Sequence, residues 1–230
     1  MSDHMRAARD HRIYHFTHLD NMSEIHQVGR LMGDAAARQG HMRREVGDPA
    51  IKEARRRRVL PLPPGGRVGD YVPFYYAPRS PMMFRIACDH RDGIAGRYPG
   101  GDRPLVYLVS SVGAIVDAGL TWLATDGNAA TATTEFTADL GRLHDMIDWP
   151  LMVAERWNNT EDDPDRQRRR MAEFLVHQQV PLSAIRWLAT YSEFYAARLR
   201  ETLGDHELTD RIIVRPSWYY GYEQRRGGVR

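Results

Sequence analysis

The segment Gly69–Pro81 reads GDYVPFYYAPRSP, and the rest of the chain is organised around it. Proline donates no hydrogen bond to a β-ladder, so Pro73 and Pro78 predict an edge strand or a stiff loop here rather than a central strand. Because proline suits the first turn of a helix, the segment also predicts a helix start at Ser80–Pro81.

Four aromatic side chains in this segment offer large stacking faces at small entropic cost. They are Tyr71, Phe74, Tyr75 and Tyr76. With Arg79 beside them, they suit a nucleotide or a base. Rings of this kind are also common in protein cores, and residue type alone favours core for most of them. A ligand-binding role for this segment therefore needs evidence from residues elsewhere in the chain.

The composition is typical of one globular domain. The chain has 230 residues, of which 42% are hydrophobic and 27% charged, and no apolar run approaches a membrane span. We expect a disordered N-terminus or expression remnant over 1–12, one domain over 13–220 and a flexible tail over 221–230. The single cysteine, Cys88, cannot form an internal disulfide and favours a reducing cytoplasm. Ten scattered histidines predict no metal site.

Two clusters of basic residues are candidates for phosphate contacts, although the net charge is only +2. One comprises Arg43, Arg44, Lys52 and Arg55–Arg58, before the aromatic segment, and the other comprises Arg166 and Arg168–Arg170. The alternative is a pair of solvated helix faces, which most arginine runs are. The clusters alone therefore do not decide whether a polyanion binds.

Short strands and helices alternate irregularly along the chain, which favours an α+β fold over a regular βαβ array. We expect strands at 13–17, 105–109, 172–177, 185–190 and 211–215, and helices that begin near residues 20, 148 and 192. Residues 30–66 are poor in periodic apolar residues and predict an irregular, mobile arm with one short helix after Asp48–Pro49. A second exposed loop is expected after Thr125.

Two of the predicted strands carry polar side chains. Alternation places Glu173 and His177 on one face of the 172–177 strand, and a carboxylate in an apolar strand is costly unless it is paired or functional. His15 and Thr17 share one face of the first strand and can present two polar groups side by side. A buried histidine with satisfied hydrogen bonds is the alternative for His15.

Four blocks of the sequence, in order, resemble the DNA ADP-ribosyltransferase toxins of the DarT type. They are Tyr14–Asn21 (YHFTHLDN), Ile51–Arg55 (IKEAR), Gly69–Met82 (GDYVPFYYAPRSPM) and Ala172–His177 (AEFLVH). Leu105–Gly113, Val214–Arg215 and Trp218–Tyr220 also fit, so the resemblance extends from residue 14 to residue 220. Four ordered blocks are far more specific than any single motif.

The resemblance implies an ADP-ribosyltransferase fold, with a split mixed β-sheet, surrounding helices and an NAD cleft. It implies Glu173 as the catalytic carboxylate and Arg55 as the arginine of the active site. Contacts with NAD are implied for His15, Thr17, Asn21, Gly29, Tyr71, Phe74 and Arg79, and contacts with DNA for Arg56, Arg58, Asn128 and Arg169. Asn128 stands where relatives often carry histidine. An asparagine is neither an acid nor a base, but it can hydrogen-bond a base.

The function implied by the resemblance is transfer of ADP-ribose from NAD to a base in single-stranded DNA, with thymidine favoured by the overall pattern of blocks. A macrodomain antitoxin that removes the modification usually accompanies such toxins. We further expect a cytoplasmic monomer without a metal ion. The alternatives are the same enzyme with an RNA, guanosine-DNA or protein acceptor, and a non-catalytic binder of single-stranded nucleic acid whose aromatic rings stack on bases.

Overall fold

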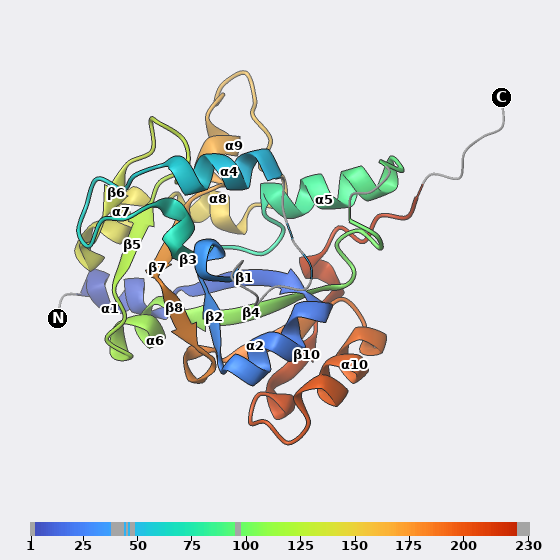
Figure 1. Cartoon of the computed structure of the whole chain (residues 1–230). Coiled ribbons are helices and arrows are strands. Elements are labelled where there is room, and N and C mark those ends of the chain that lie inside the picture. The colour runs from blue at the N-terminus through green and yellow to red at the C-terminus, as the bar shows by residue number, and fades with distance from the viewer. Residues whose placement is uncertain (1–2, 38–43, 45, 47–48, 95–97, 225–230) are drawn as a thin grey trace, which may run out of the picture.

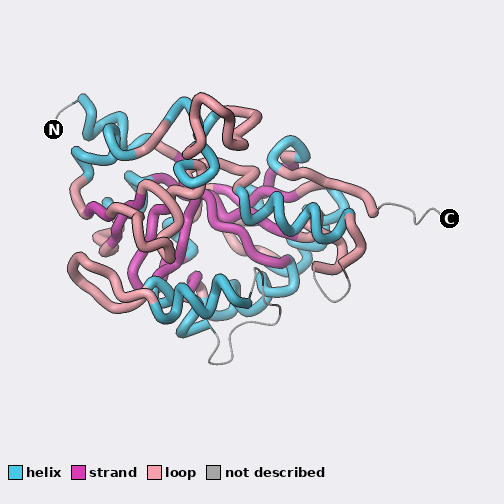
Figure 2. The backbone as a smooth tube through the Cα atoms, turned by 90° about the horizontal axis from the view of Figure 1, so that it is seen from above, coloured by secondary structure: helices cyan, strands magenta, loops and turns pink. Residues whose placement is uncertain are grey.

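A mixed β-sheet of eight strands forms the centre of the computed structural model, which describes residues 3–37, 44, 46, 49–94 and 98–224. Helices and loops surround this sheet (Figure 1, Figure 2). The strand order is β10-β9-β4-β1-β3-β7-β5-β6, and a small second sheet pairs β2 with β8. The strands are β1 (Arg12–His18), β2 (Arg30–Met32), β3 (Tyr71–Tyr75), β4 (Leu105–Ser111), β5 (Trp122–Thr125), β6 (Phe136–Thr137), β7 (Glu173–His177), β8 (Gln179–Pro181), β9 (Trp187–Thr190) and β10 (Ile212–Val214).

The helices cover the sheet on both sides. They are α1 (Asp3–Asp10), α2 (Met22–Val28), α3 (Asp34–Ala37), α4 (Pro49–Arg57), α5 (Pro81–Arg91), α6 (Val112–Asp117), α7 (Leu143–Met146), α8 (Trp149–Val153), α9 (Arg166–Arg169) and α10 (Glu193–Leu203). In Figure 1, α4 and α5 lie above the strands, whereas α2 and α10 lie below them. Pairs of described strands are antiparallel except β9 with β10, which confirms the predicted α+β fold with a mixed sheet.

The sheet is split between β1 and β3. These two strands share a single backbone pair, Tyr14 with Tyr75, whereas β1 pairs with β4 at seven positions and β3 with β7 at five. Among the described residues, this is the one backbone pair that joins the two halves of the sheet. Because Tyr75 is also opposite Glu173 on β7, the split lies next to the predicted catalytic carboxylate.

The segment Gly69–Pro81 contains a central strand, so the prediction of an edge strand or stiff loop was wrong. Pro73 is tolerated in the centre because it lies at the split. Its carbonyl oxygen accepts a hydrogen bond from His15 Nδ1 on β1 at 2.8 Å. The N–H and C=O of a strand residue point to the same side, so the N–H that proline lacks would face β1 where no ladder exists. The predicted helix start is confirmed, since Ser80 caps α5 and Pro81 occupies its first turn.

Alternation along the strands divides the core into two layers. Ile13, Val72 and Phe174 face a layer that includes residues of α1, α6 and α10. Tyr14 and Tyr107 face the opposite layer, which includes residues of α5. Glu173 lies on the same face of β7 as Leu175, which packs beside Tyr71. This second face therefore carries both Tyr71 of the aromatic segment and the predicted catalytic residue.

Two predictions of irregular structure differ from what the described residues form. In the N-terminal segment, α1 packs so closely on α6 that a Cβ on Gly113 would lie 2.9 Å from the carbonyl oxygen of Arg9. Buried Ala8 and an ion pair between Arg9 and Asp117 also hold this helix. In the arm, Leu31 is buried and β2 pairs with β8, while α3 and α4 continue the ordered structure. The rest of the predicted arm, 38–43, 45 and 47–48, lies outside the described residues.

The C-terminal segment is attached to the domain as far as Gly221. Buried Asp102 accepts hydrogen bonds from the backbone N–H groups of Tyr220 and Gly221. Residues 225–230 of the predicted tail are outside the described part of the chain. Among the described residues, no helix has the length and apolar character needed to cross a membrane.

Candidate active site

A cavity of about 330 Å³ opens at the split in the sheet. From β1 it is lined by three consecutive residues, His15, Phe16 and Thr17. Alternation would place consecutive residues on opposite faces of a closed sheet, but the edges of β1 and β3 are separated here, so both faces reach the cavity. Described residues of the α2–α4 region, β3, α5, Tyr98, Asn128 and the segment before β7 complete its walls.

Glu173 lies in the wall of this cavity with only 2% of its surface exposed. Arg55 Nη1 donates hydrogen bonds to both carboxylate oxygens, at 2.8 Å to Oε1 and 3.0 Å to Oε2. The backbone N–H of Ala129 donates to Oε2 at 2.9 Å. A buried carboxylate with these three contacts is held in one orientation. The structure thus brings together the two residues for which catalysis was predicted.

The backbone of Glu173 is fixed by Thr125 at the end of β5. Its N–H donates to Thr125 Oγ1 at 2.9 Å, and this hydroxyl donates to the carbonyl oxygen of Gly127 at 2.7 Å. Tyr75 lines the cavity on the neighbouring strand, and burial together with the Glu173 charge raises the pKa of its phenol. The Tyr75 hydroxyl therefore stays neutral beside the carboxylate at physiological pH.

Arg55 is presented by α4, whose last turn packs against residues 68–70. A Cβ on Gly69 would lie 3.2 Å from Arg56 Cγ, so glycine permits this close approach. Burial alone would lower the pKa of Arg55, but the Glu173 carboxylate raises it above its ordinary value. Its Nη2 is buried and has no hydrogen-bond partner among the described residues. Arg55 thus holds Glu173 through one nitrogen and leaves another for a ligand.

Asp34 ties α3 to α4 at the edge of the cavity. It accepts hydrogen bonds from Lys52 Nζ and Arg56 Nε, both at 2.9 Å. Burial would raise the pKa of Asp34, but Lys52 and Arg56 lower it below its ordinary value. Arg56 also pairs with Glu53 at 3.2 Å. With two carboxylate partners, Arg56 positions α4, and its DNA contact stays a prediction.

His15 bridges the split. Its Nδ1 donates to the Pro73 carbonyl oxygen at 2.8 Å, because a carbonyl can only accept. Burial lowers the pKa of His15 to about 4, with the Pro73 hydrogen bond opposing the shift and Lys52 adding to it. His15 is therefore neutral near pH 7, and its Nε2 is a hydrogen-bond acceptor.

We predict that His15 makes the fold less stable in acid. Between its ordinary pKa of 6.5 and its folded value of about 4, the unfolded chain binds a proton that the folded chain does not. The free energy of unfolding should therefore fall by about 3 kcal/mol across this window as the pH decreases. Urea unfolding at pH 7 and pH 4 measures this fall, and a His15→Gln variant should lack that part of it. Equal pH dependence in the two proteins would contradict the assignment.

Thr17 and Asn21 form a polar corner of the cavity. Asn21 Nδ2 donates to Thr17 Oγ1 at 2.9 Å and to the carbonyl oxygen of Arg44 at 2.7 Å. The Arg44 N–H donates back to Asn21 Oδ1 at 2.7 Å. Four residues predicted to contact NAD therefore line one cavity with Glu173 and Arg55. They are His15, Thr17, Asn21 and Tyr71.

Three other predicted NAD contacts do not line this cavity. Phe74 is fully buried and faces the opposite core layer, because alternation turns it away from Pro73 and Tyr75. Gly29 ends α2 with a φ of 74°. Arg79 has a φ of 56°, and its guanidinium lies over the Tyr220 ring at 4.6 Å. These residues have structural roles in the core, a helix end and a turn.

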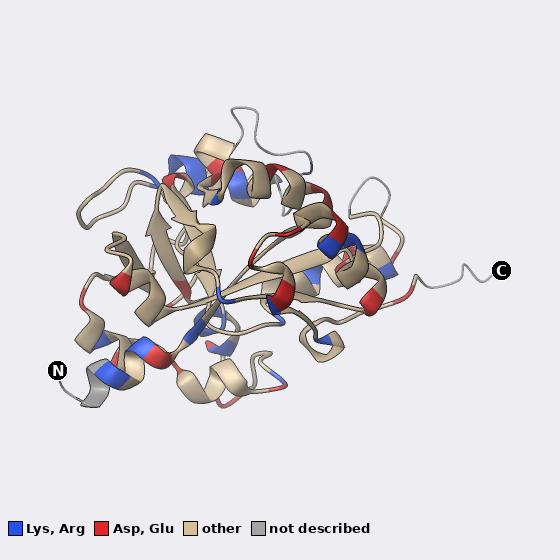
Figure 3. Cartoon of the chain, turned by 90° about the horizontal axis from the view of Figure 1, so that it is seen from below, with Lys and Arg blue, Asp and Glu red and all other residues tan. Residues whose placement is uncertain are grey.

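Of the remaining residues predicted to contact DNA, one lines the cavity and two do not. Arg169 pairs with Asp148 at 3.0 Å, with Asp163 at 2.6 Å and with Asp165 at 3.5 Å, so its charge is neutralised. Arg58 reaches the Ala132 carbonyl oxygen at 3.5 Å, outside the cavity, and its DNA contact stays a prediction. Asn128 lines the cavity, next to the Ala129 N–H that holds Glu173. Figure 3 shows acidic and basic residues interspersed along the chain, which agrees with such pairing.

Several residues of the site carry no role in the sequence-based prediction. Asp34 lies on the cavity wall, and Gln167 and Met171 line it from the segment before β7. Lys52, which was predicted as a candidate for phosphate contacts, also lines the cavity. Its position three residues before Arg55 on one helix could have indicated a shared face. No group of three or more His, Cys, Asp or Glu side chains in the described residues could hold a metal ion.

Comparisons with known proteins agree over nearly the whole chain. The model of the family described as DarT, ssDNA thymidine ADP-ribosyltransferase, matches residues 14–220. A DNA ADP-ribosyl transferase of Mycobacterium tuberculosis is 38% identical over 218 residues, covering 94% of this chain and 91% of that protein. A DNA ADP-ribosyl transferase-DNA ADP-ribosyl glycohydrolase fusion protein of Thermosipho africanus is 25% identical over 214 residues, which span 92% of this chain and 50% of the fusion.

Solved structures give the same result. The DarT of Thermus sp. 2.9 in complex with ADP-ribosylated ssDNA superposes with a TM-score of 0.81 at 32% identity, covering 91% of this chain and 96% of that one. The same protein in complex with NAD+ gives a TM-score of 0.77 at 31% identity, with 91% and 98% covered.

Proposed function

Since the chain belongs to the DarT family of single-stranded-DNA thymidine ADP-ribosyltransferases, and is an NAD-dependent enzyme of that kind, we propose that Glu173 and Arg55 carry out its transfer of ADP-ribose to thymidine. The observation that carries this proposal is the buried Glu173 carboxylate, which Arg55 and the Ala129 N–H hold in the wall of a 330 Å³ cavity.

The chemistry requires a fixed anion. Transfer breaks the bond between ribose C1′ and the nicotinamide nitrogen, and the bonding electrons leave with neutral nicotinamide. Positive charge develops on the ribose, as in glycoside cleavage. A preorganised carboxylate beside that charge is worth roughly 3 kcal/mol or more of transition-state stabilisation. Glu173 supplies this charge without reorganisation, because its three hydrogen bonds already exist.

The acceptor must lose a proton as it forms its bond to C1′. In thymine, N3 is the only ring nitrogen that carries a proton, because N1 is bonded to the sugar. Attack by N3 therefore gives a neutral substituted base and releases one proton. Glu173 lies in the cavity wall, and we assign its carboxylate as the acceptor of this proton.

The donor is NAD, and the cavity offers groups that suit its two ends. Arg55 Nη2 is buried without a partner among the described residues, which suits a phosphate or carbonyl oxygen. Arg44 and Lys52 add positive charge to the wall for the diphosphate. Neutral His15, Thr17 and Asn21 provide an uncharged polar corner for the nicotinamide end.

The biological setting proposed for this chain is that of a toxin. The Thermosipho africanus relative joins a DNA ADP-ribosyl transferase to a DNA ADP-ribosyl glycohydrolase in one protein. We therefore propose that a separate glycohydrolase antitoxin removes the modification that this chain makes. The site draws on NAD and single-stranded DNA, which meet in the cytoplasm, and a single copy of the chain supplies every residue named for it.

We predict that the protein, incubated with NAD, adds one ADP-ribose to a single-stranded DNA oligonucleotide containing thymidine and releases one nicotinamide. Mass spectrometry of parallel reactions with DNA, RNA and a protein acceptor measures the transfer. An oligonucleotide of the same length without thymidine is the control and should gain no mass. Modification of RNA or protein alone would show that DNA is not the acceptor. Absence of nicotinamide release in every reaction would refute the transferase activity.

A further inference from the structure

The carboxamide of Asn128 is held in one of its two possible orientations. Its Oδ1 accepts a hydrogen bond from the backbone N–H of Ala130 at 2.9 Å, as in an Asx turn. A backbone N–H can only donate, so the oxygen of the carboxamide must face Ala130. Asn128 Nδ2 has no hydrogen-bond partner among the described residues. The group left for a ligand is therefore a donor of two N–H bonds and cannot accept.

The loop that carries Asn128 is rigid. The Asn128 carbonyl oxygen accepts from Thr134 Oγ1 at 2.7 Å and from the Thr131 N–H at 2.9 Å. On the other side, a Cβ on Gly127 would lie 3.0 Å from Arg168 Nη1, so the loop packs directly on the segment before β7. An ion pair between Asp126 and Arg168 at 2.6 Å closes this contact. The donor is therefore fixed in position as well as in type.

Asn128 also lines the same cavity as the proposed catalytic carboxylate. The next residue, Ala129, donates its N–H to Glu173 Oε2 at 2.9 Å. In thymine the reacting N3 is flanked by two carbonyl groups, C2=O2 and C4=O4. A donor one residue away from the Glu173 anchor is placed to meet a carbonyl that flanks N3.

We propose that Asn128 Nδ2 donates a hydrogen bond to thymine O4 and thereby selects thymidine over cytidine as the acceptor. This inference rests on the proposed function. At position 4, thymine presents an acceptor oxygen, whereas cytosine presents an amino group that donates. A donor that cannot rotate to become an acceptor pairs with thymine and leaves the cytosine amino group facing another N–H. Asn128 is thus a specificity-determining residue, and proton transfer remains with Glu173.

The test replaces single atoms on both partners. In an oligonucleotide with one acceptor base, thymidine is replaced by 4-thiothymidine or by 2-thiothymidine. Both analogues make a carbonyl oxygen into a weakly accepting sulfur, so they form a matched pair that differs only in which flank of N3 is changed. The measured quantity is kcat/KM for transfer by the wild-type protein, Asn128→Ala and the control Asn158→Ala. Asn158 is exposed, donates to the Asn159 carbonyl oxygen at 3.1 Å and does not line the cavity.

Wild-type protein and Asn158→Ala should lose roughly 10-fold more activity with the 4-thio than with the 2-thio base. Asn128→Ala should be slower on thymidine by roughly 10- to 100-fold and should treat the two analogues alike. Asn128→Asp keeps the oxygen that Ala130 requires and removes only the donor, so it tests the same point if the alanine variant does not fold. Its loss should be roughly 100-fold or more, because an anion faces O4.

Three results would overturn the proposal: wild-type rates in Asn128→Ala or Asn128→Asp, a 4-thio effect that persists in them, or a wild-type effect that follows the 2-thio base instead. Each of these presupposes that the wild-type protein modifies thymidine. Absence of that modification would refute the proposed function itself, so the two failures are distinguishable.

Discussion

The Glu173→Gln variant is expected to transfer ADP-ribose to thymidine roughly 10³-fold more slowly than the wild-type protein, or not at all. A glutamine side chain has nearly the same shape as glutamate, and its carbonyl oxygen can still accept hydrogen bonds from Arg55 and Ala129. The variant loses the negative charge that faces the developing cation and the group that takes the proton from the base. Single-turnover transfer to a thymidine oligonucleotide measures this loss.

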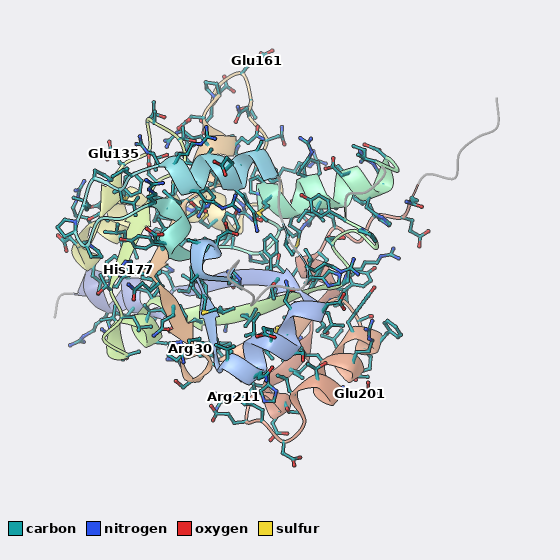
Figure 4. All side chains as sticks on the ribbon, viewed as in Figure 1. Arg30, Glu135, Glu161, His177, Glu201 and Arg211 are labelled. Atoms are coloured by element: carbon teal, nitrogen blue, oxygen red, sulfur yellow. The ribbon has the colours of Figure 1, made fainter. Side chains whose placement is uncertain are left out.

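The control for this variant is its fold. Because a neutral amide remains paired with Arg55, we expect a native circular dichroism spectrum and a cooperative melt. A folded Glu173→Gln protein with wild-type activity would remove Glu173 from the mechanism. Glu135 and Glu161 offer matched substitutions, since both are exposed, neither lines the cavity, and their side chains point outward in Figure 4. Their glutamine variants should remain active.

The second large effect is expected for Arg55→Ala. Removing the Arg55 guanidinium leaves the buried Glu173 carboxylate with the Ala129 N–H as its hydrogen-bond donor. Breaking one side of a buried ion pair costs about 3–5 kcal/mol of stability. Transfer should also fall by roughly 100-fold or more, because the carboxylate loses its orientation and NAD loses its proposed contact with Arg55 Nη2. Chemical denaturation and transfer kinetics measure the two effects separately.

Arg55→Lys separates stability from activity. Lysine keeps the positive charge beside Glu173 but lacks the second nitrogen of the guanidinium fork. We expect this variant to recover most of the stability and little of the activity. Normal kinetics in a folded Arg55→Lys or Arg55→Ala protein would show that Arg55 serves the fold alone.

Local patterns were sufficient to predict much of the fold. Alternation in AEFLVH placed Glu173 on one face of a strand, and β7 confirms it. Gly29 and Ser80 mark helix ends, as glycine and serine commonly do. The central position of β3 could not be predicted, because a proline is excluded from a closed ladder but not from a split one. That split is a property of β1 and β3 together, and no single segment encodes it.

The site shows the same limit. Glu173 and Arg55 are 118 residues apart in the sequence. From the sequence alone, only the family resemblance placed them in one site. Phe74 failed as a cavity residue although strand alternation could have shown that it faces away from Tyr75. The ion pairs of Arg169 were not predicted, although two of its acidic partners, Asp163 and Asp165, lie within six residues of it in the sequence. Its DNA contact stays a prediction.

We propose that the cavity lined by Glu173 and Arg55 is where thymidine in single-stranded DNA is modified. The most direct measurement is fragment-ion mass spectrometry of an oligonucleotide with one thymidine, after incubation with NAD and either the wild-type protein or Glu173→Gln. We predict one ADP-ribose on the thymine base with the wild-type protein and none with the variant. An ADP-ribose on another base, or equal modification by the folded variant, would contradict the claim.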